Sequence, residues 1–315
     1  MDDDAPFDTA SPVAVVGAGA VGTALARRLV TGRIPVQAIL SRTAADALAL
    51  ADRVGAPVAS DEWAALPESV RLVMLCVPDD ALPAVAEALA AVDHPWERTI
   101  VGHTAGARTA AVLAPLAHEG AATLSFHPLQ TYTADTPPEA FDDITIGIEG
   151  DPDAVAAGKA LARALGARPV VLTARAKALY HCAAALASNG LVALMAVVEE
   201  LLAAADVETD GQSAAALMAP LVKQTWANLE AAPPEGVLTG PVARGDEETV
   251  AAHLDALQEG TPHLLPLYAA LSTEMTRVAV RGGELDGDTA EKLLQMLQKT
   301  LQSSSDDIAP FGSSH

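Results

Sequence analysis

The chain has 315 residues, of which 50% are apolar, 3% are aromatic and only two are cysteines, and its formal net charge is −22. At roughly 100–200 residues per domain, this length allows two domains. The 41 acidic and 19 basic residues exclude a general binder of nucleic acid or of anionic membranes, because such proteins need a basic face. The acidic excess fits either a salt-rich cytoplasm or an ordinary solvated surface, and both interpretations stay open.

The two cysteines, Cys76 and Cys182, stand in apolar surroundings far apart in the sequence. This usage predicts reduced, buried thiols rather than a disulfide framework. The acidic stretch Met1–Ser11 lacks the positive and apolar regions of a secretory signal. We therefore expect a cytoplasmic protein, and no metal site is predicted.

The first half of the chain alternates short apolar runs with alanine-rich helical stretches. The predicted strands are Pro12–Val16, Val36–Leu40, Arg71–Val77, Thr99–Gly102, Ala122–Phe126, Ile144–Ile148 and Pro169–Leu172. The helices predicted between them are Val21–Thr31, Ala44–Val54, Leu82–Ala91, Arg108–Ala117 and Pro152–Leu165. Continuously apolar strands separated by helices indicate a largely parallel sheet covered on both faces. The fold class is therefore α/β, with a doubly wound, Rossmann-type domain over residues 1–173.

After Thr173 the pattern becomes helical throughout. Residues 174–206 contain no proline and a single glycine, which predicts a helix far longer than average. We expect this helix to be buried on nearly every side, at the centre of an all-helical domain over residues 174–302. Four more helices are predicted at Gln212–Ala231, Asp246–Leu257, His263–Arg281 and Gly287–Leu301, followed by a flexible tail over residues 303–315.

A membrane span over residues 182–198 is the alternative for the centre of this long helix. Ser188 and Asn189 stand in the middle of the stretch, and Lys177 and His181 precede it. Alanine, the commonest residue there, contributes little to membrane insertion. A helix of a soluble protein is therefore favoured.

A glycine-rich turn follows the first predicted strand and opens the first helix. It reads Gly17-Ala18-Gly19-Ala20-Val21-Gly22. Gly17 permits a tight turn, Gly19 lets the backbone approach a pyrophosphate, and Gly22 lets the helix pack closely on the strand. The free N–H groups of the helix N-terminus then hold the phosphates. The alternative is a glycine-rich turn without a ligand, but the position between strand and helix favours dinucleotide binding.

The end of the second strand decides between the two nicotinamide cofactors. An acidic residue there would bind the ribose hydroxyls and repel a 2′-phosphate, whereas this chain has Ser41-Arg42-Thr43. A hydroxyl and a guanidinium match a phosphate dianion. We therefore predict NADP(H), with an ordinary surface arginine as the alternative.

Three further motifs stand at predicted strand ends. They contain Val77-Pro78, Gly102-His103-Thr104-Ala105-Gly106 and Ser125-Phe126-His127-Pro128. Ligands of open α/β sheets bind outside the carboxyl ends of the strands, so these residues are expected to line the cofactor crevice. His103 and His127 are candidate hydrogen-bond donors to a ligand or, alternatively, core histidines.

The order of these motifs resembles the 6-phosphogluconate-dehydrogenase-like oxidoreductases, which include pyrroline-5-carboxylate reductase, ketopantoate reductase and prephenate dehydrogenase. The chain is most similar to the Rossmann-like proteins that carry the domain of unknown function 2520. The motifs are His103-Thr104-Ala105-Gly106, Phe126-His127-Pro128-Leu129, Tyr180-His181, Ser188-Asn189, Thr239-Gly240-Pro241 and Arg244-Gly245-Asp246. The resemblance covers about residues 12–301. It implies an NAD(P)-binding first domain and a helical second domain that often forms the dimer interface, but it supplies no substrate.

The long helix carries the remaining candidates for chemistry. Lys177 and His181 are four residues apart, and Ser188 falls three turns after Lys177, so these three share one stripe. Asn189 is rotated by about 100° from Ser188 and could border the same pocket. Polar groups on so apolar a helix are costly unless they are satisfied, which favours a shared polar cleft. The alternative is a lysine that reaches solvent and a histidine buried by packing.

In the related ketopantoate and hydroxyacid enzymes, a lysine of the corresponding helix donates a proton to the substrate. The resemblance implies this role for Lys177. Those families have an asparagine one turn later, where this chain has His181. The proton donor is therefore either Lys177 or His181.

A loop in the second domain contains Arg244-Gly245-Asp246. Arg244 could bind a substrate carboxylate with two parallel hydrogen bonds. Equally, Asp246 could cap the following helix and pair with Arg244.

Together these features predict an NADP(H)-dependent oxidoreductase that acts on a small carbonyl or imine substrate, one that carries a carboxylate. Ser188, Asn189 and His127 would orient this substrate. A cytoplasmic homodimer formed through the helical domain is expected. The alternative is a non-catalytic NADPH sensor, or a partner-binding protein, on the same fold.

Overall fold

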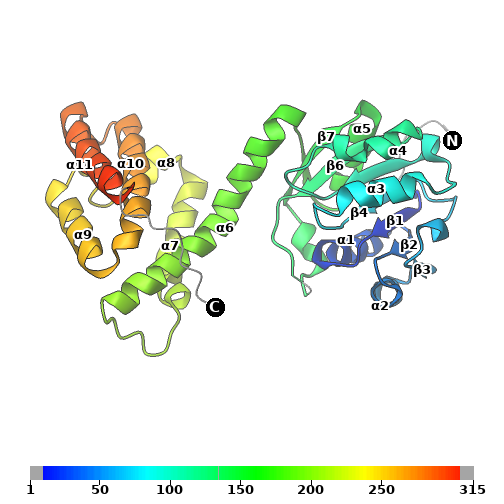
Figure 1. The fold of residues 1–315 in the computed structure, drawn as a ribbon, viewed down its shortest axis with the longest axis horizontal. Helices are drawn as coiled ribbons and strands as arrows, with labels where there is room; N and C mark the ends of the chain where they lie inside the picture. Colours follow the sequence, from blue (N-terminus) through cyan, green and yellow to red (C-terminus); the bar gives the residue numbers. More distant parts are fainter. Residues whose placement is uncertain (1–9, 134, 306–315) are drawn as a thin grey trace. The chain divides into compact units, whose positions relative to one another are not determined.

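The computed structural model describes residues 10–133 and 135–305 of the chain (Figure 1). It consists of two compact units, residues 1–188 and 189–315. The long helix α6 (Ala174–Ala204) crosses this division. The predicted domain boundary at 173/174 coincides with the start of α6, but the contacts change only after Ser188 because the first turns of α6 pack on the first unit.

The described part of the first unit contains one eight-stranded sheet with the strand order β3-β2-β1-β4-β5-β6-β7-β8. The strands are β1 (Val13–Val16), β2 (Val36–Leu40), β3 (Val58–Ser60), β4 (Leu72–Leu75), β5 (Ile100–His103), β6 (Ala122–Pro128), β7 (Thr145–Gly150) and β8 (Arg168–Val171). All neighbouring strands are parallel except β6 and β7, which are antiparallel. The predicted doubly wound fold is confirmed. Only the short strand β3 was missed, because its three residues are half-buried and carry no clear apolar run.

Helices cover both faces of this sheet. They are α1 (Ala20–Thr31), α2 (Ala44–Val54), α3 (Leu82–Ala90), α4 (Ala114–His118) and α5 (Pro152–Ala164). The helices α1, α2 and α5 share one apolar core with the sheet, and α3 and α4 share a second core on the other face. Where one helix was predicted over Arg108–Ala117, a 3-10 turn over Ala110–Leu113 precedes α4.

The chain order explains where a ligand can bind. Strand β1 lies between β2 and β4, so the chain runs from β1 to one side of the sheet and later continues on the other side. At this point of reversal the loops that follow neighbouring parallel strands separate and leave a crevice at the carboxyl ends. The loops after β1, β2, β4 and β5 all leave the sheet at this edge.

The second unit consists of helices throughout its described residues. Besides the end of α6, they are α7 (Ala214–Ala231), α8 (Pro234–Val237), α9 (Glu247–Gly260), α10 (Leu265–Gly282) and α11 (Gly287–Ser305). Apolar residues of α9, α10 and α11 form its core, and Val197 and Leu201 of α6 pack against it. The all-helical prediction is confirmed. Residues 303–305 of the predicted tail belong to α11, and residues 306–315 lie outside the described part.

The prediction that α6 is buried on nearly every side is wrong. Of its 31 residues only Lys177 is buried. Its most apolar stretch has a mean hydropathy of 1.7 and no buried residue, so α6 is long and apolar enough to cross a membrane by length and composition alone. An apolar helix is stable in water only when other atoms shield its side chains. The sequence does not show whether those atoms belong to the same chain or to another molecule. Cys182, on the same helix, is exposed, whereas Cys76 is buried as predicted.

Candidate functional site

The turn between β1 and α1 brings three segments of backbone close together. Gly17 has a φ of +106°, and its N–H donates to the Leu40 carbonyl at the end of β2 over 2.7 Å. A Cβ on Gly17 would overlap the Cys76 carbonyl, and a Cβ on Gly22 would overlap the Gly17 carbonyl. Glycine at both positions therefore lets α1 and the ends of β1 and β4 meet.

The remaining glycine of this turn, Gly19, faces open space. Apart from Gly19 and its two chain neighbours, no atom of the described residues lies within 4 Å of the place that its Cβ would take. Gly19 caps α1 without a side-chain hydrogen bond, so the cap leaves the first N–H groups of the helix to another partner. A cavity of about 300 Å³ adjoins the turn, and its lining includes Ala18, Gly19, Ala20, Thr23, Asp46 and Arg53. An open helix N-terminus of this kind fits a pyrophosphate.

The residues after β2 present one cation at the same edge. The Ser41 side chain is buried, and its N–H donates to the Ser60 carbonyl at the end of β3 over 3.1 Å. Thr43 caps α2 by accepting a hydrogen bond from the Asp46 N–H. Arg42 lies between them, is exposed, and makes no hydrogen bond or ion pair with residues 10–133 or 135–305. Its guanidinium is therefore available to an anion.

The loops after β4 and β5 complete this edge. Val77 is half-buried and Pro78 is exposed. The Thr104 N–H donates to the Leu75 carbonyl over 3.1 Å. These positions are compatible with the predicted cofactor crevice, and their contacts with a cofactor stay predictions.

His103 ends β5 and is fully buried. Its Nδ1 accepts from the Ala105 N–H over 3.2 Å, and its Nε2 donates to the Thr109 carbonyl over 3.1 Å. Both ring nitrogens thus hold the loop that follows β5. A cofactor contact of His103 stays a prediction, but the ring has no free nitrogen to offer.

Lys177, in the first turn of α6, lies inside the protein. Its side chain is only 1% exposed, and its Nζ donates to the Ser125 Oγ over 2.5 Å. Ser125 is fully buried in β6. A lysine that reaches solvent keeps its amine in water, so this burial excludes the alternative in which the Lys177 amine reaches solvent.

Three aromatic side chains contact one another near this pair. The ring of His127 makes edge-to-face contacts with Tyr180 and with His181, with centroid separations of 5.8 and 5.6 Å. Two glycines leave the room for these rings. A Cβ on Gly106 would overlap the ring of His181, and one on Gly147 would lie 3.0 Å from the Tyr180 ring.

Three polar atoms of these rings are buried without a hydrogen-bond partner among the residues that the structure describes. They are the Nδ1 atoms of His127 and His181 and the Oη of Tyr180. Buried polar atoms usually have hydrogen-bond partners, and those that lack one often serve a function. This cluster is therefore a candidate for the place where a polar substrate binds.

The charges of the cluster follow from burial. Burial lowers the pKa of the Lys177 amine, while the carboxylates of Glu149 and Asp79 oppose this shift. Burial, aided by the charges of Lys177 and His181, lowers the pKa of His127 to about 4. His127 is therefore neutral at pH 7 and can orient a ligand by hydrogen bonding without carrying charge.

The other predicted substrate residues lie outside this cluster. Ser188 stands 11 residues after Lys177, which corresponds to about 16 Å along a helix. In the described chain, neither Ser188 nor the exposed Asn189 makes a hydrogen bond or ring contact with the cluster. Their roles stay predictions.

Arg244 belongs to the second unit and is exposed. Asp246 caps α9 by accepting a hydrogen bond from the Thr249 N–H over 3.0 Å. The charge of Arg244 helps to keep the pKa of Asp246 low, after the hydrogen bonds from Thr249. Capping by Asp246 is therefore confirmed, whereas an ion pair of Arg244 with Asp246 and carboxylate binding by Arg244 stay predictions.

The sequence did not identify Glu149 as a site residue, and it placed Ser125 and Tyr180 in motifs without a role for either side chain. Ser125 lies between two apolar residues of β6, and Glu149 is the charged residue of β7, which was the available signal. Their neighbourhood depends on the pairing of β6 with β7, which no local pattern states. Tyr180 precedes His181 and is placed by the turn of α6.

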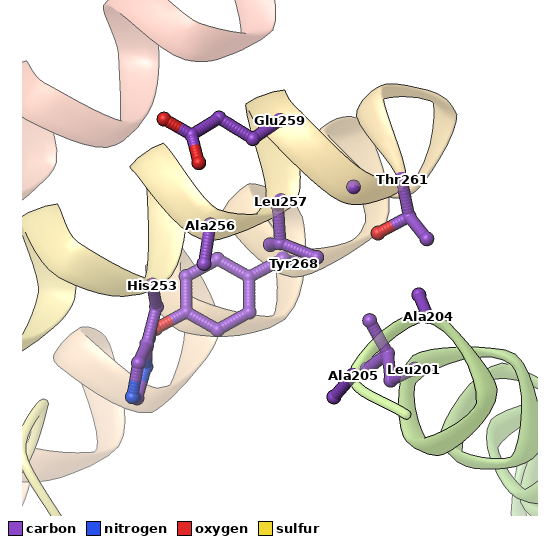
Figure 2. Close-up of a pocket in the computed structure, with 10 residues that line it drawn as sticks. Leu201, Ala204, Ala205, His253, Ala256, Leu257, Glu259, Thr261 and Tyr268 are labelled. Atoms are coloured by element: carbon purple, nitrogen blue, oxygen red, sulfur yellow. Dashed lines mark hydrogen bonds between the residues drawn. The ribbon is translucent and has the colours of Figure 1, made fainter. Parts of the chain in front are cut away.

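A second cavity, of about 650 Å³, lies within the helical unit between the end of α6 and the helices α9 and α10 (Figure 2). His253 and Tyr268 stand together on one wall, where the His253 Nδ1 and the Tyr268 Oη are 2.8 Å apart. Leu201, Ala204 and Ala205 form the opposite wall. The lining is mainly apolar and holds no buried amine. The Lys177 cluster is therefore the stronger candidate for catalysis.

Two sequence families match consecutive parts of the chain. The profile of the Rossmann-like domain matches residues 7–128, and that of the domain of unknown function DUF2520 matches residues 144–275. The chain is a Rossmann-like protein with a DUF2520 domain. The DUF2520 region begins with β7 and includes Lys177 and His181, so the candidate site combines residues of both matched regions. No curated protein sequence matches the chain.

Solved structures show the same architecture. A candidate NADP oxidoreductase from Bacteroides fragilis is 25% identical, with a TM-score of 0.69 over 85% of this chain and 99% of the other. A protein from Thermotoga maritima is 21% identical, with a TM-score of 0.61 over 93% and 99% of the two chains. A reductive aminase from Aspergillus terreus, in complex with NADPH and ethyl-5-oxohexanoate, is 17% identical, with a TM-score of 0.56 over 93% and 94%. The last two are similar in fold.

The glycine turn yields the first prediction. Gly22→Ala forces a methyl group into the Gly17 carbonyl and should lower the free energy of unfolding by about 1–3 kcal/mol, measured by urea denaturation. Gly19→Ala meets open space and should change it by less than about 1 kcal/mol, but should weaken NADPH binding measured by fluorescence. Equal destabilisation by the two changes would contradict this assignment of the glycines.

Proposed function

We propose that this DUF2520 protein is an NADP(H)-dependent oxidoreductase that transfers hydride to or from a small carbonyl or imine substrate bearing a carboxylate. The observation that carries the proposal is the buried Lys177 amine beside Ser125, at the same edge of the sheet as the open glycine turn. A pyrophosphate site and a group able to exchange a proton are the two requirements of this chemistry. The NADP oxidoreductase and reductive aminase of the same fold support the proposal.

In this proposal the backbone of the glycine turn binds the pyrophosphate through the open N-terminus of α1. Ser41 and Arg42 bind the 2′-phosphate, since a hydroxyl and a guanidinium match its charge and geometry. In a chain of charge −22, a local cation also offsets the repulsion of an anionic cofactor. The bound nicotinamide supplies or accepts the hydride.

Lys177 or His181 transfers the proton. Burial lowers the pKa of the Lys177 amine, which improves a lysine as a general acid. His127 is neutral at pH 7 and orients the substrate. The unpartnered Nδ1 of His181 and Oη of Tyr180 offer further hydrogen bonds to a polar substrate. In the direction of reduction, the proton goes to the oxygen or nitrogen as the neighbouring carbon receives hydride.

The choice of cofactor gives the second prediction. Arg42→Ala should weaken NADPH binding by about tenfold or more, because a charge-assisted hydrogen bond contributes roughly 1.5–3 kcal/mol. NADH affinity should stay nearly unchanged, since it lacks the 2′-phosphate. Arg163→Ala removes an exposed arginine of α5 and serves as the matched control. An unchanged preference for NADPH in Arg42→Ala would contradict the assignment.

The proton donor gives the third prediction. Lys177→Met and His181→Asn are compared in NADPH oxidation with 2-keto acids, cyclic imines and aldehydes. Loss of the proton donor should lower turnover by about 10²–10⁴-fold and leave NADPH binding nearly intact. A lysine acid is active below its pKa, so reduction should decline as the pH rises, earlier than for an exposed lysine because burial lowers this pKa.

Full activity of both variants would refute these roles. A titration step of His127 should be absent between about pH 5 and 8, because its pKa is about 4. Tight NADPH binding by the wild type without turnover of any of these substrates would favour a non-catalytic sensor.

We also propose a cytoplasmic homodimer formed through the helical unit. Val192 of α6 is 71% exposed, and Leu221 and Trp226 of α7 are 65% and 57% exposed. Exposed apolar patches of this kind mark interaction surfaces. Residues 178–198 contain no Asp, Glu, Lys or Arg. A face without charge is where two copies of so acidic a chain can meet without strong repulsion.

The fourth prediction tests this assembly. Val192→Asp and Leu221→Asp should convert a dimer to monomers in analytical ultracentrifugation without detergent, because each places a carboxylate in the interface. Leu48→Asp changes a side chain of α2 that is 55% exposed and should leave the dimer intact. A monomeric wild type would refute the dimer, and a wild type that needs detergent to stay in solution would favour a membrane-associated helix.

A further inference from the structure

Three side chains form a row across the sheet beneath α6. In the strand register, His103 of β5 pairs with Ser125 of β6, and Ser125 pairs with Glu149 of β7. Paired residues point to the same face, and their Cβ atoms lie about 4.5–5.5 Å apart in an antiparallel pair. Because Lys177 donates to Ser125, its amine lies within reach of the side chain of Glu149.

The carboxylate of Glu149 is held in place. Its Oε2 accepts a hydrogen bond from the Ala110 N–H over 2.9 Å, and the residue is half-buried. The hydrogen bond connects the carboxylate to the turn that precedes α4. Glu149 is therefore a fixed negative charge beside the buried amine.

The other titratable groups that face Lys177 come from the neighbouring elements. They are Asp79 after β4, His103 of β5 and His127 of β6; His181 stands one turn after Lys177 on α6 itself and acts on His127. Burial lowers the pKa of His103 and of His127 to about 4, so both are neutral at pH 7. Asp79 is exposed, and its effect on Lys177 is smaller than that of Glu149. Glu149 is thus the main group that can balance the charge of the ammonium.

We propose that Ser125 and Glu149 are positioning residues for Lys177, Ser125 by fixing the place of the amine and Glu149 by stabilising its ammonium form. The inference rests on the proposed role of Lys177 as proton donor. In that role an N–H bond of the ammonium breaks as the O–H or N–H bond of the product forms. The neutral amine then takes a proton from water, and the charge of Glu149 favours this recovery.

The role of Glu149 is tested on the full chain without cofactor, by NMR titration of ¹³C-labelled lysine. The chain has five lysines, and Lys177→Met assigns the signal of Lys177 by its loss. Glu149→Gln keeps an acceptor for the Ala110 N–H but removes the charge, so the midpoint of Lys177 should move to lower pH. Glu87→Gln removes an exposed carboxylate of α3 and should leave the midpoint unchanged. An unchanged midpoint in Glu149→Gln overturns the role of Glu149.

The role of Ser125 is tested with a matched pair of variants. Ser125→Thr keeps the hydroxyl, whereas Ser125→Val has nearly the same shape without it, and both suit a strand. The threonine variant should retain most of the turnover, and the valine and alanine variants should lose about 10²-fold in kcat with little change in NADPH affinity. Wild-type turnover in Ser125→Ala overturns the role of Ser125, and so does equal loss in the threonine and valine variants.

The two experiments separate this inference from the proposed function. The lysine titration needs no substrate, so it supports or overturns the role of Glu149 even if the wild type reduces none of the tested substrates. The serine series measures the other residue independently, including the case in which Glu149→Gln does not fold.

Discussion

The burial of the Lys177 amine is the constraint on which the rest of the candidate site depends. A buried ammonium without partners costs several kcal/mol, so a fold that tolerates one must supply hydrogen bonds or charge. Here Ser125 accepts a hydrogen bond from it, and the fixed carboxylate of Glu149 lies in the neighbouring strand. The reversed direction of β7 matters because it places Glu149 directly opposite Ser125. Gly106 and Gly147 then leave room for the rings of His181 and Tyr180.

The two cations of the candidate site, Arg42 and Lys177, differ in exposure. Arg42 is exposed at the end of β2, and a guanidinium keeps its charge at any physiological pH, which suits permanent attraction of a phosphate. Lys177 is buried, and burial lowers its pKa, which suits a group that must give up a proton and regain it. In the proposed function, this difference in exposure distinguishes the arginine that binds a phosphate from the lysine that transfers a proton.

The local sequence was sufficient to predict most strands and the glycine-rich turn. Apolar runs predicted seven of the eight described strands, and the glycines between β1 and α1 predicted a turn whose backbone geometry the structure confirms. The cluster around Lys177 was only half predicted. Lys177, His181 and His127 were identified from helix spacing and strand ends, but Glu149 depends on the register of two antiparallel strands. The exposure of α6 was missed because apolar residues look alike whether their own chain or another molecule covers them.

The glycine turn and the Lys177 cluster are held in position by different kinds of contact. The glycine turn is made of backbone, and its geometry is fixed by contacts so close that a single Cβ would overlap them. The proposed proton-transfer site is made of side chains from β6, β7 and α6, so its geometry depends on how the first turns of α6 pack on the sheet. The first two turns of α6 carry Lys177, Tyr180 and His181. Thr173, which directly precedes α6, accepts a hydrogen bond from the Ala176 N–H and so caps the helix. Because a helix is rigid, these three groups keep fixed positions relative to one another. A contact between Ser125 of β6 and the Lys177 amine therefore helps to fix the position of all three.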